Sequence, residues 1–168
     1  MEKWFLKKFY CFSRYGSHVV ANGEIYNYRS LIDEFGLSTD DLVTRSDSEI
    51  IIHGFAKIGP EICNKLIGMF AFVLATDDGD FIAGRDKIGI KPLYMGKTRD
   101  DKATIFSSEL KAIIDLCDPK DLQTFPAGHY WTPSTGLVRY YKVSWHKLIG
   151  DFIAGRDKIG IKPQYNPC

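Results

Sequence analysis

The sequence lacks the features that mark several large classes of protein. Its 168 residues include 22 Lys plus Arg and 21 Asp plus Glu, and this formal charge of +1 gives no electrostatic reason to expect nucleic acid or a membrane as a partner. No apolar run approaches the roughly 20 residues of a membrane span, and lysines near the start interrupt the run that a signal peptide needs. We therefore expect a cytoplasmic protein with one core.

Motifs for nucleotides, metals and disulfides are also missing. Neither Gly-x-x-x-x-Gly-Lys-Ser/Thr nor Gly-x-Gly-x-x-Gly occurs, so no nucleotide site is predicted. The four cysteines are widely spaced and form no Cys-x-x-Cys pair: Cys11, Cys63, Cys117 and Cys168. With no histidine in ligand-like register beside them, we expect no metal, free thiols in a reducing compartment, and a buried, inert Cys63.

The first half of the chain predicts one strand followed by helices. The β-branched residues of "SHVVANGEIYN" indicate a strand that meets the Asn22-Gly23 pair, and "YRSLIDEFG" has apolar residues at helical spacing. Ser46 with Glu49 three residues later has the pattern of a capping box. That box would open an apolar helix that ends near Gly59.

The second half predicts hairpins. Asp77-Asp78-Gly79 separates two apolar, β-rich runs, and further turns are expected near residues 99–101 and 134–136. A short helix is expected in "SELKAIIDLC". Helices followed by consecutive hairpins favour an α+β protein with a largely antiparallel sheet over a doubly wound parallel one.

Fourteen residues, "GDFIAGRDKIGIKP", occur twice, at 79–92 and again at 150–163. Two short copies do not make a repeat architecture, which needs three or more stacked units. In the first copy the strand residues have a hairpin partner, whereas the second copy lacks the Asp-Asp-Gly turn. We expect 143–168 to be a loosely attached tail with no second active site.

Three short motifs each allow a structural and a functional interpretation. Asn22-Gly23 is a common two-residue hairpin turn, but an Asn amide beside a Gly backbone N–H can also bind a developing oxyanion. Asp47 in a first helical turn favours the helix dipole, or it could bind a substrate ammonium. Arg85 and Asp86 are more often structural than catalytic.

Taken in order, six segments resemble one family: "NGEIYN", "TRSDSEII", "GMFAFVL", "GRDKIGIKPLY", "FSSELKAI" and "FPAGHY". The run closely resembles the glutamine amidotransferase domain of glutamine-hydrolysing asparagine synthetase, a class II amidotransferase of the N-terminal-nucleophile hydrolase group. The resemblance implies a four-layer αββα sandwich, incomplete at its N-terminus. It also implies glutamine as the ligand and a possible homodimer.

The resemblance implies roles for four residues. In the family a thiol attacks the glutamine side-chain amide, and the Asn and Gly of "NGE" hold the oxyanion, which here gives Asn22 and Gly23. The Asp of "SD" binds the glutamine amine, which gives Asp47, with Glu24 beside the oxyanion pair. Ammonia then reaches a synthetase domain that uses ATP and magnesium; no cofactor is expected in this chain.

The chain departs from the family in ways that concern activity. It opens Met1-Glu2-Lys3 rather than Met-Cys-Gly, so the nucleophilic cysteine is expected to be absent, and Cys11 is not a credible substitute. We expect an unrelated segment at 1–16, a partial amidotransferase domain at 17–142 and a tail at 143–168. Losing a nucleophile costs about 10⁶ in rate, so we expect an inactive chain. The alternatives are a non-catalytic glutamine-binding or regulatory remnant and a fragment of another class II amidotransferase.

Overall fold

The computed structural model describes residues 10–14, 16–38, 41–44 and 46–142. These residues form a six-stranded sheet in the order β1-β2-β3-β4-β8-β9 and a three-stranded sheet in the order β6-β5-β7, and every strand pair is antiparallel. The strands of the larger sheet are β1 (Tyr10–Arg14), β2 (Ser17–Ile25), β3 (Gly68–Thr76), β4 (Phe81–Arg85), β8 (His129–Thr132) and β9 (Gly136–Arg139). Those of the smaller sheet are β5 (Tyr94–Lys97), β6 (Thr104–Ser107) and β7 (Gln123–Thr124).

The helices are short and follow β2 and β6. Between β2 and β3 lie α1 (Tyr28–Glu34), the 3₁₀ turn η2 (Asp47–Glu49), α2 (Ile50–Ile58), the 3₁₀ turn η3 (Gly59–Glu61) and α3 (Ile62–Lys65). Up to residue 142, the one helical element after β6 is the 3₁₀ turn η4 (Leu110–Ala112), where the sequence predicted a short helix. The expected helix end near Gly59 is confirmed, since Gly59 follows the last residue of α2.

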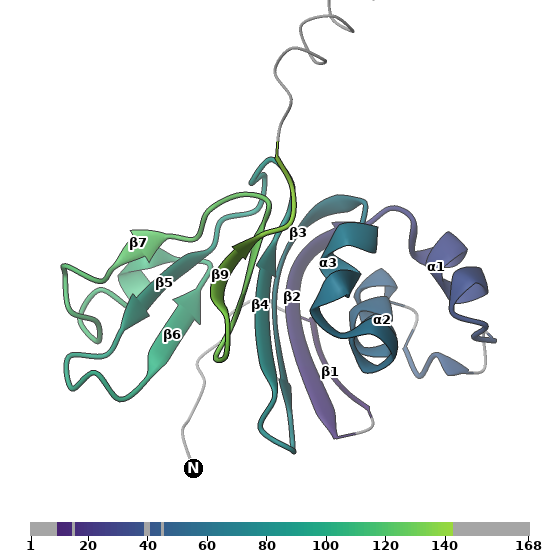
Figure 1. Ribbon diagram of the computed structural model, residues 1–168, viewed down its shortest axis with the longest axis horizontal. Coiled ribbons are helices and arrows are strands. Elements are labelled where there is room, and N and C mark those ends of the chain that lie inside the picture. The colour runs from purple at the N-terminus through teal and green to yellow at the C-terminus, as the bar shows by residue number, and fades with distance from the viewer. Residues whose placement is uncertain (1–9, 15, 39–40, 45, 143–168) are drawn as a thin grey trace, which may run out of the picture.

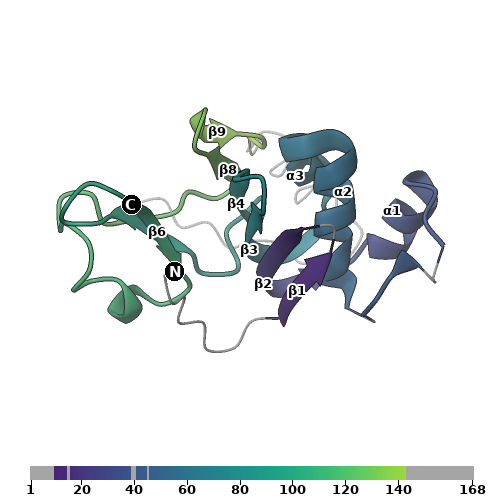
Figure 2. The same cartoon turned by 90° about the horizontal axis from the view of Figure 1, so that it is seen from below.

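The larger sheet is covered on both faces, with α1, α2 and α3 on one side and the small sheet on the other (Figure 1; Figure 2). Along β3, Phe70, Phe72 and Leu74 join the core shared with the helices, whereas Ala71 joins the second core. This alternation follows from the period of two in a strand. The second core, between the sheets, also contains Leu93, Met95, Phe106 and Phe125.

The α+β class with antiparallel sheets is therefore confirmed. The three expected hairpins are present as β3-β4, β5-β6 and β8-β9. Strand β1 lies inside the segment 1–16 that the sequence set apart, and it pairs with β2 from Tyr10 opposite Ala21 to Arg14 opposite Ser17. The domain boundaries stay a prediction, and the expected tail at 143–168 lies outside the described residues.

Candidate functional site

Asn22 and Gly23 lie inside strand β2 and do not form a turn. Asn22 is opposite Ala71 and Gly23 is opposite Phe70 in continuous register with β3. The hairpin interpretation of this pair is wrong because pairing with β3 overrides the local preference of Asn-Gly. Gly23 has a φ of 138°, a conformation that L side chains rarely adopt, and the backbone of Met69 fills the place of its Cβ.

Asp47 reaches the same strand from a distant part of the chain. It is the first residue of η2, and its carboxylate accepts a hydrogen bond from the backbone N–H of Ile25. The two residues are 22 positions apart in the sequence. The structure thus brings Asp47 to the end of β2 that contains Asn22, Gly23 and Glu24, of which Glu24 is exposed.

The direction of the Ile25 N–H shows to which edge of β2 the N–H of Gly23 points. Backbone N–H groups alternate between the two edges of a strand, so the N–H of Gly23, two residues earlier, points to the same edge as that of Ile25. On this edge β1 pairs with β2 only as far as Ala21 within the described residues. The N–H of Gly23 is therefore directed past the described end of β1, on the side where Asp47 lies.

Asn27, which sequence reasoning missed, fixes the corner after β2. Its side-chain amide donates to the carbonyl of Lys65 at 2.9 Å and accepts from the N–H of Ile67 at 2.9 Å. The N–H of Tyr26 donates to the carbonyl of Ile67 at 2.8 Å. Asn27 is the last residue of the motif "NGEIYN", but its hydrogen-bond partners, Lys65 and Ile67, can be identified only in the folded chain.

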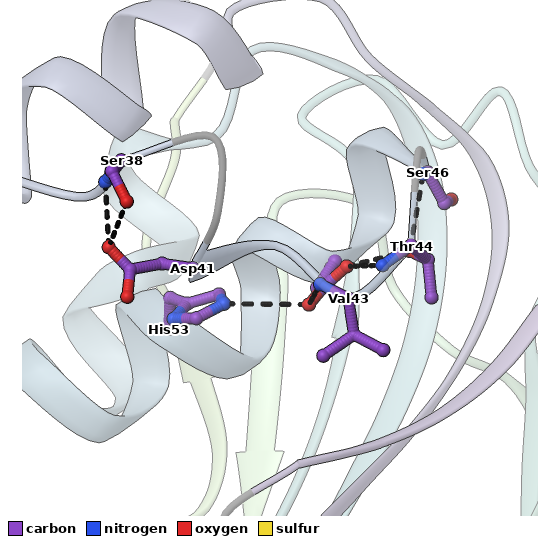
Figure 3. Close-up of polar contacts among 7 residues, drawn as sticks. Ser38, Asp41, Val43, Thr44, Ser46 and His53 are labelled. Atoms are coloured by element: carbon purple, nitrogen blue, oxygen red, sulfur yellow. Dashed lines mark hydrogen bonds and ion pairs between the residues drawn. The ribbon is translucent and has the colours of Figure 1, made fainter.

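Glu49 does not complete the capping box that the sequence predicted. Its carboxylate accepts from the N–H groups of Val43 and Thr44 and from the Thr44 hydroxyl, rather than from the N–H of Ser46 (Figure 3). Ser46 does cap the helix start, since its hydroxyl accepts from the N–H of Ser48 at 3.4 Å. His53 lies one turn further along, with Nε2 at 3.7 Å from the Glu49 carboxylate.

Glu49 ionises more readily than an ordinary glutamate. Burial by itself would raise the pKa of Glu49, but the hydrogen bonds from Thr44 and Val43, with the nearby His53, hold that pKa below its usual value. A buried carboxylate with several donors is stable as the anion. This cluster thus places a negative charge next to the segment that precedes Asp47.

The structural interpretation of Arg85 and Asp86 agrees with their contacts. The Arg85 guanidinium donates to the carbonyls of Gly89, Lys91 and Phe125. The Asp86 carboxylate is 0% exposed and accepts from the N–H groups of Ile88, Ile90 and Lys91. Both side chains hold the loop after β4 and are occupied in doing so.

The described thiols are poor nucleophiles. Cys63 and Cys117 are both free and 0% exposed, and burial raises the pKa of each thiol. Cys11 is placed in β1 opposite Val20, and Cys168 lies outside the described residues. The described residues contain no group of three or more potential metal ligands and no helix long and apolar enough to span a membrane.

The residue types at the end of β2 are ones that can contact a carbonyl and an ammonium group. A carboxylate at the start of η2 can accept from an ammonium, while an amide side chain and a glycine N–H can donate to an oxygen that gains negative charge. The glycine leaves the backbone open to close approach. Among the cysteines whose side chains the structure describes, neither Cys63 nor Cys117 is exposed to act as a nucleophile.

Comparisons with known proteins point to one family. Residues 11–115 match the family described as "Glutamine amidotransferase domain". The asparagine synthetase [glutamine-hydrolyzing] of Zea mays is 46% identical over 129 residues, which cover 76% of this chain and 21% of that protein. Asparagine synthetase B of Escherichia coli is 38% identical over 145 residues, 85% of this chain and 25% of that protein. The chain thus spans about a fifth to a quarter of the length of these relatives.

Solved structures show the same fold at lower identity. The glutamine phosphoribosylpyrophosphate amidotransferase from B. subtilis superimposes with a TM-score of 0.59 at 22% identity, covering 78% of this chain and 31% of that one. A structure of the allosteric regulatory enzyme of purine biosynthesis gives a TM-score of 0.56 at 21% identity. At these identities the likeness concerns the fold alone.

Proposed function

This chain belongs to the family of glutamine amidotransferase domains, and we propose that it binds glutamine at the end of β2 as part of the amidotransferase site of an asparagine synthetase. Asp47 binds the glutamine ammonium, and Asn22 and Gly23 hold the amide oxygen, with Glu24 beside them. The observation that supports this most directly is the hydrogen bond from Ile25 to Asp47. This hydrogen bond joins the motif "NGEIYN", which contains Ile25, to the motif "TRSDSEII", which contains Asp47.

The proposed chemistry is acyl transfer. Where a thiol is supplied, a base takes its proton, the thiolate attacks the side-chain amide carbon and the carbonyl oxygen becomes an oxyanion. Collapse of the tetrahedral intermediate, with the proton returned to the nitrogen, breaks the C–N bond, releases ammonia and leaves a thioester that water hydrolyses to glutamate. Donors aimed at the oxyanion are worth about 10²–10³ in rate. In this site they are the Asn22 amide and the Gly23 N–H, which points to the edge of β2 where Asp47 lies.

We propose that the 168 residues bind glutamine without hydrolysing it at a measurable rate. Cys11, Cys63 and Cys117 are followed by Phe, Asn and Asp, whereas the family's nucleophile stands in Met-Cys-Gly. Cys63 and Cys117 are moreover buried with raised pKa values. Ammonia release then requires a suitable thiol. The ATP- and magnesium-dependent step from aspartate to asparagine requires a synthetase domain.

Calorimetric titration with L-glutamine tests the binding site. Asp47→Asn keeps the shape and an acceptor for Ile25 but removes the charge that faces the ammonium; we expect affinity to fall by about tenfold or more, the value of one charged hydrogen bond. Asp77→Asn is the matched control, because it removes a charge from an exposed turn where the partner is His18. Equal affinities for wild type and Asp47→Asn would contradict the proposed role of Asp47.

An ammonia-release assay tests the second part. Wild-type chain should release no ammonia from glutamine above the background rate. Glutaminase activity that Cys11→Ala abolishes would overturn the proposal that this chain lacks a nucleophile. Glutamine binding without turnover agrees with it, and binding with turnover does not.

A further inference from the structure

Glu49 lies two residues after Asp47 in η2, and its carboxylate is buried and bonded to an earlier part of the chain. Glu49 is 1% exposed and His53 is 3% exposed. The contacts of Glu49 run backward along the chain: Oε1 accepts from the N–H of Val43 at 2.8 Å, and Oε2 accepts from the N–H and hydroxyl of Thr44 at 2.7 Å each. One side chain thus holds the segment that enters η2.

A relay of hydrogen bonds connects this carboxylate to Asp47. The Thr44 hydroxyl donates to Glu49 and accepts from the N–H of Ser46 at 3.2 Å (Figure 3). The Ser46 hydroxyl lies 3.5 Å from Oδ1 of Asp47. The other oxygen of Asp47 accepts from Ile25 on β2. The links through Thr44 fix the backbone before Asp47, and the links to Ser46 and Ile25 hold its carboxylate.

We infer that Glu49 is a positioning residue for glutamine recognition: by pinning Val43 and Thr44 it holds the carboxylate of Asp47 against β2, where that carboxylate meets the ligand's ammonium. This inference rests on the proposed function of Asp47. A glutamate is needed because three donors converge on its two oxygens. A glutamine side chain has one acceptor oxygen and would point its NH₂ group at one of these donors.

The test compares Glu49→Gln with Asp86→Asn in the full 168-residue chain. Asp86 is a matched control because it is also a buried carboxylate with three donors, here the backbone N–H groups of the loop after β4. Three quantities are measured: the melting temperature, the affinity for L-glutamine, and the hydrogen exchange rate of the Ile25 amide by NMR. The Ile25 amide reports directly on the contact with Asp47.

Both variants should lower the melting temperature, but only Glu49→Gln should change the site. We expect it to weaken glutamine binding about tenfold, the value of a charged hydrogen bond, and to speed exchange of the Ile25 amide by a similar factor. Asp86→Asn should leave both readings at the wild-type level. Unchanged affinity and exchange in Glu49→Gln would overturn the inference, and so would equal changes in the two variants.

Thr44→Val covers the case in which Glu49→Gln does not fold. It keeps the side-chain shape and the Thr44 N–H but removes the hydroxyl that joins Glu49 to Ser46. We expect a smaller change of the same sign in affinity and Ile25 exchange, and wild-type values for both would contradict the inference. If wild type binds no glutamine, the proposed function fails, while Ile25 exchange in these variants still decides whether Glu49 holds Asp47.

Discussion

Gly23 and Met69 approach each other so closely that no side chain fits between the two strands. A Cβ atom on Gly23 would lie 2.8 Å from the carbonyl carbon of Met69 and closer still to its oxygen. Both atoms belong to the backbone of β3, which is paired with β2, so neither can move without disturbing that pairing. The glycine of the proposed oxyanion pair therefore has a structural role as well.

Gly23→Ala should destabilise the fold strongly. Overpacking of this kind costs about 1–3 kcal/mol or more, and backbone atoms relax less readily than side chains. Gly79→Ala is the control, since Gly79 also has a positive φ of 92° but nothing lies within 4 Å of its added Cβ. Denaturant unfolding followed by circular dichroism should show the larger loss for Gly23→Ala, and equal losses would show that φ alone matters.

Acid should reduce the stabilising effect of Glu49. Its pKa in the folded chain lies below the ordinary value of 4.5, so its contribution is complete above that value and is lost as the pH falls through the lower folded value. Glu49→Gln has no such group to titrate. The difference in unfolding free energy between wild type and this variant should therefore shrink on acidification, whereas parallel curves would contradict the assigned pKa shift.

Thiol labelling should show that Cys63 and Cys117 are protected in the folded chain. Cys63 and Cys117 are buried with raised pKa values, so both should resist alkylation at neutral pH in the native chain and react after unfolding in denaturant. Mass spectrometry of digested protein locates the label. Rapid native labelling of Cys63 would mean that the core around it opens far more often than its burial implies.

Deleting residues 145–168 tests the prediction of a loosely attached tail. In the first copy of the duplicated stretch, Phe81 to Arg85 form β4, which is paired with β3 and with β8. The sheet position for this sequence is thus already occupied. The deletion should leave the melting temperature unchanged or improve solubility, whereas a marked loss of stability would show that the second copy contributes to the core.

Local signals predicted the parts of the fold that depend on local chemistry. The Asp77-Asp78-Gly79 turn was correct because Gly79 takes the positive φ that such a turn needs, and the N–H of Gly79 bonds back to Thr76 at 3.0 Å. The helix end at Gly59 follows the same reasoning. The helix expected in "SELKAIIDLC" is only the turn η4, none of whose three residues is buried. The spacing of apolar residues in the sequence could not show this lack of burial.

The site depends on contacts that sequence cannot place. Asn22-Gly23 has the composition of a hairpin turn, and only the continuous pairing with β3 shows that it is strand. Glu49 has the spacing of a capping box, but Val43 and Thr44 present donors that compete for its carboxylate. The family resemblance named Asp47 as a ligand contact, whereas its bond to Ile25 became visible only in the structure.

Asn27 joins three elements at the corner that follows β2. Its amide bonds to Lys65 and Ile67, so the end of β2 is tied to the start of β3 and not only to α1, which follows it in sequence. Opening the corner therefore requires α3 and the start of β3 to separate from β2. Asn27 thus joins α1, whose Leu31 N–H donates to the Asn27 carbonyl at 3.1 Å, to a stretch some 40 residues further along the chain.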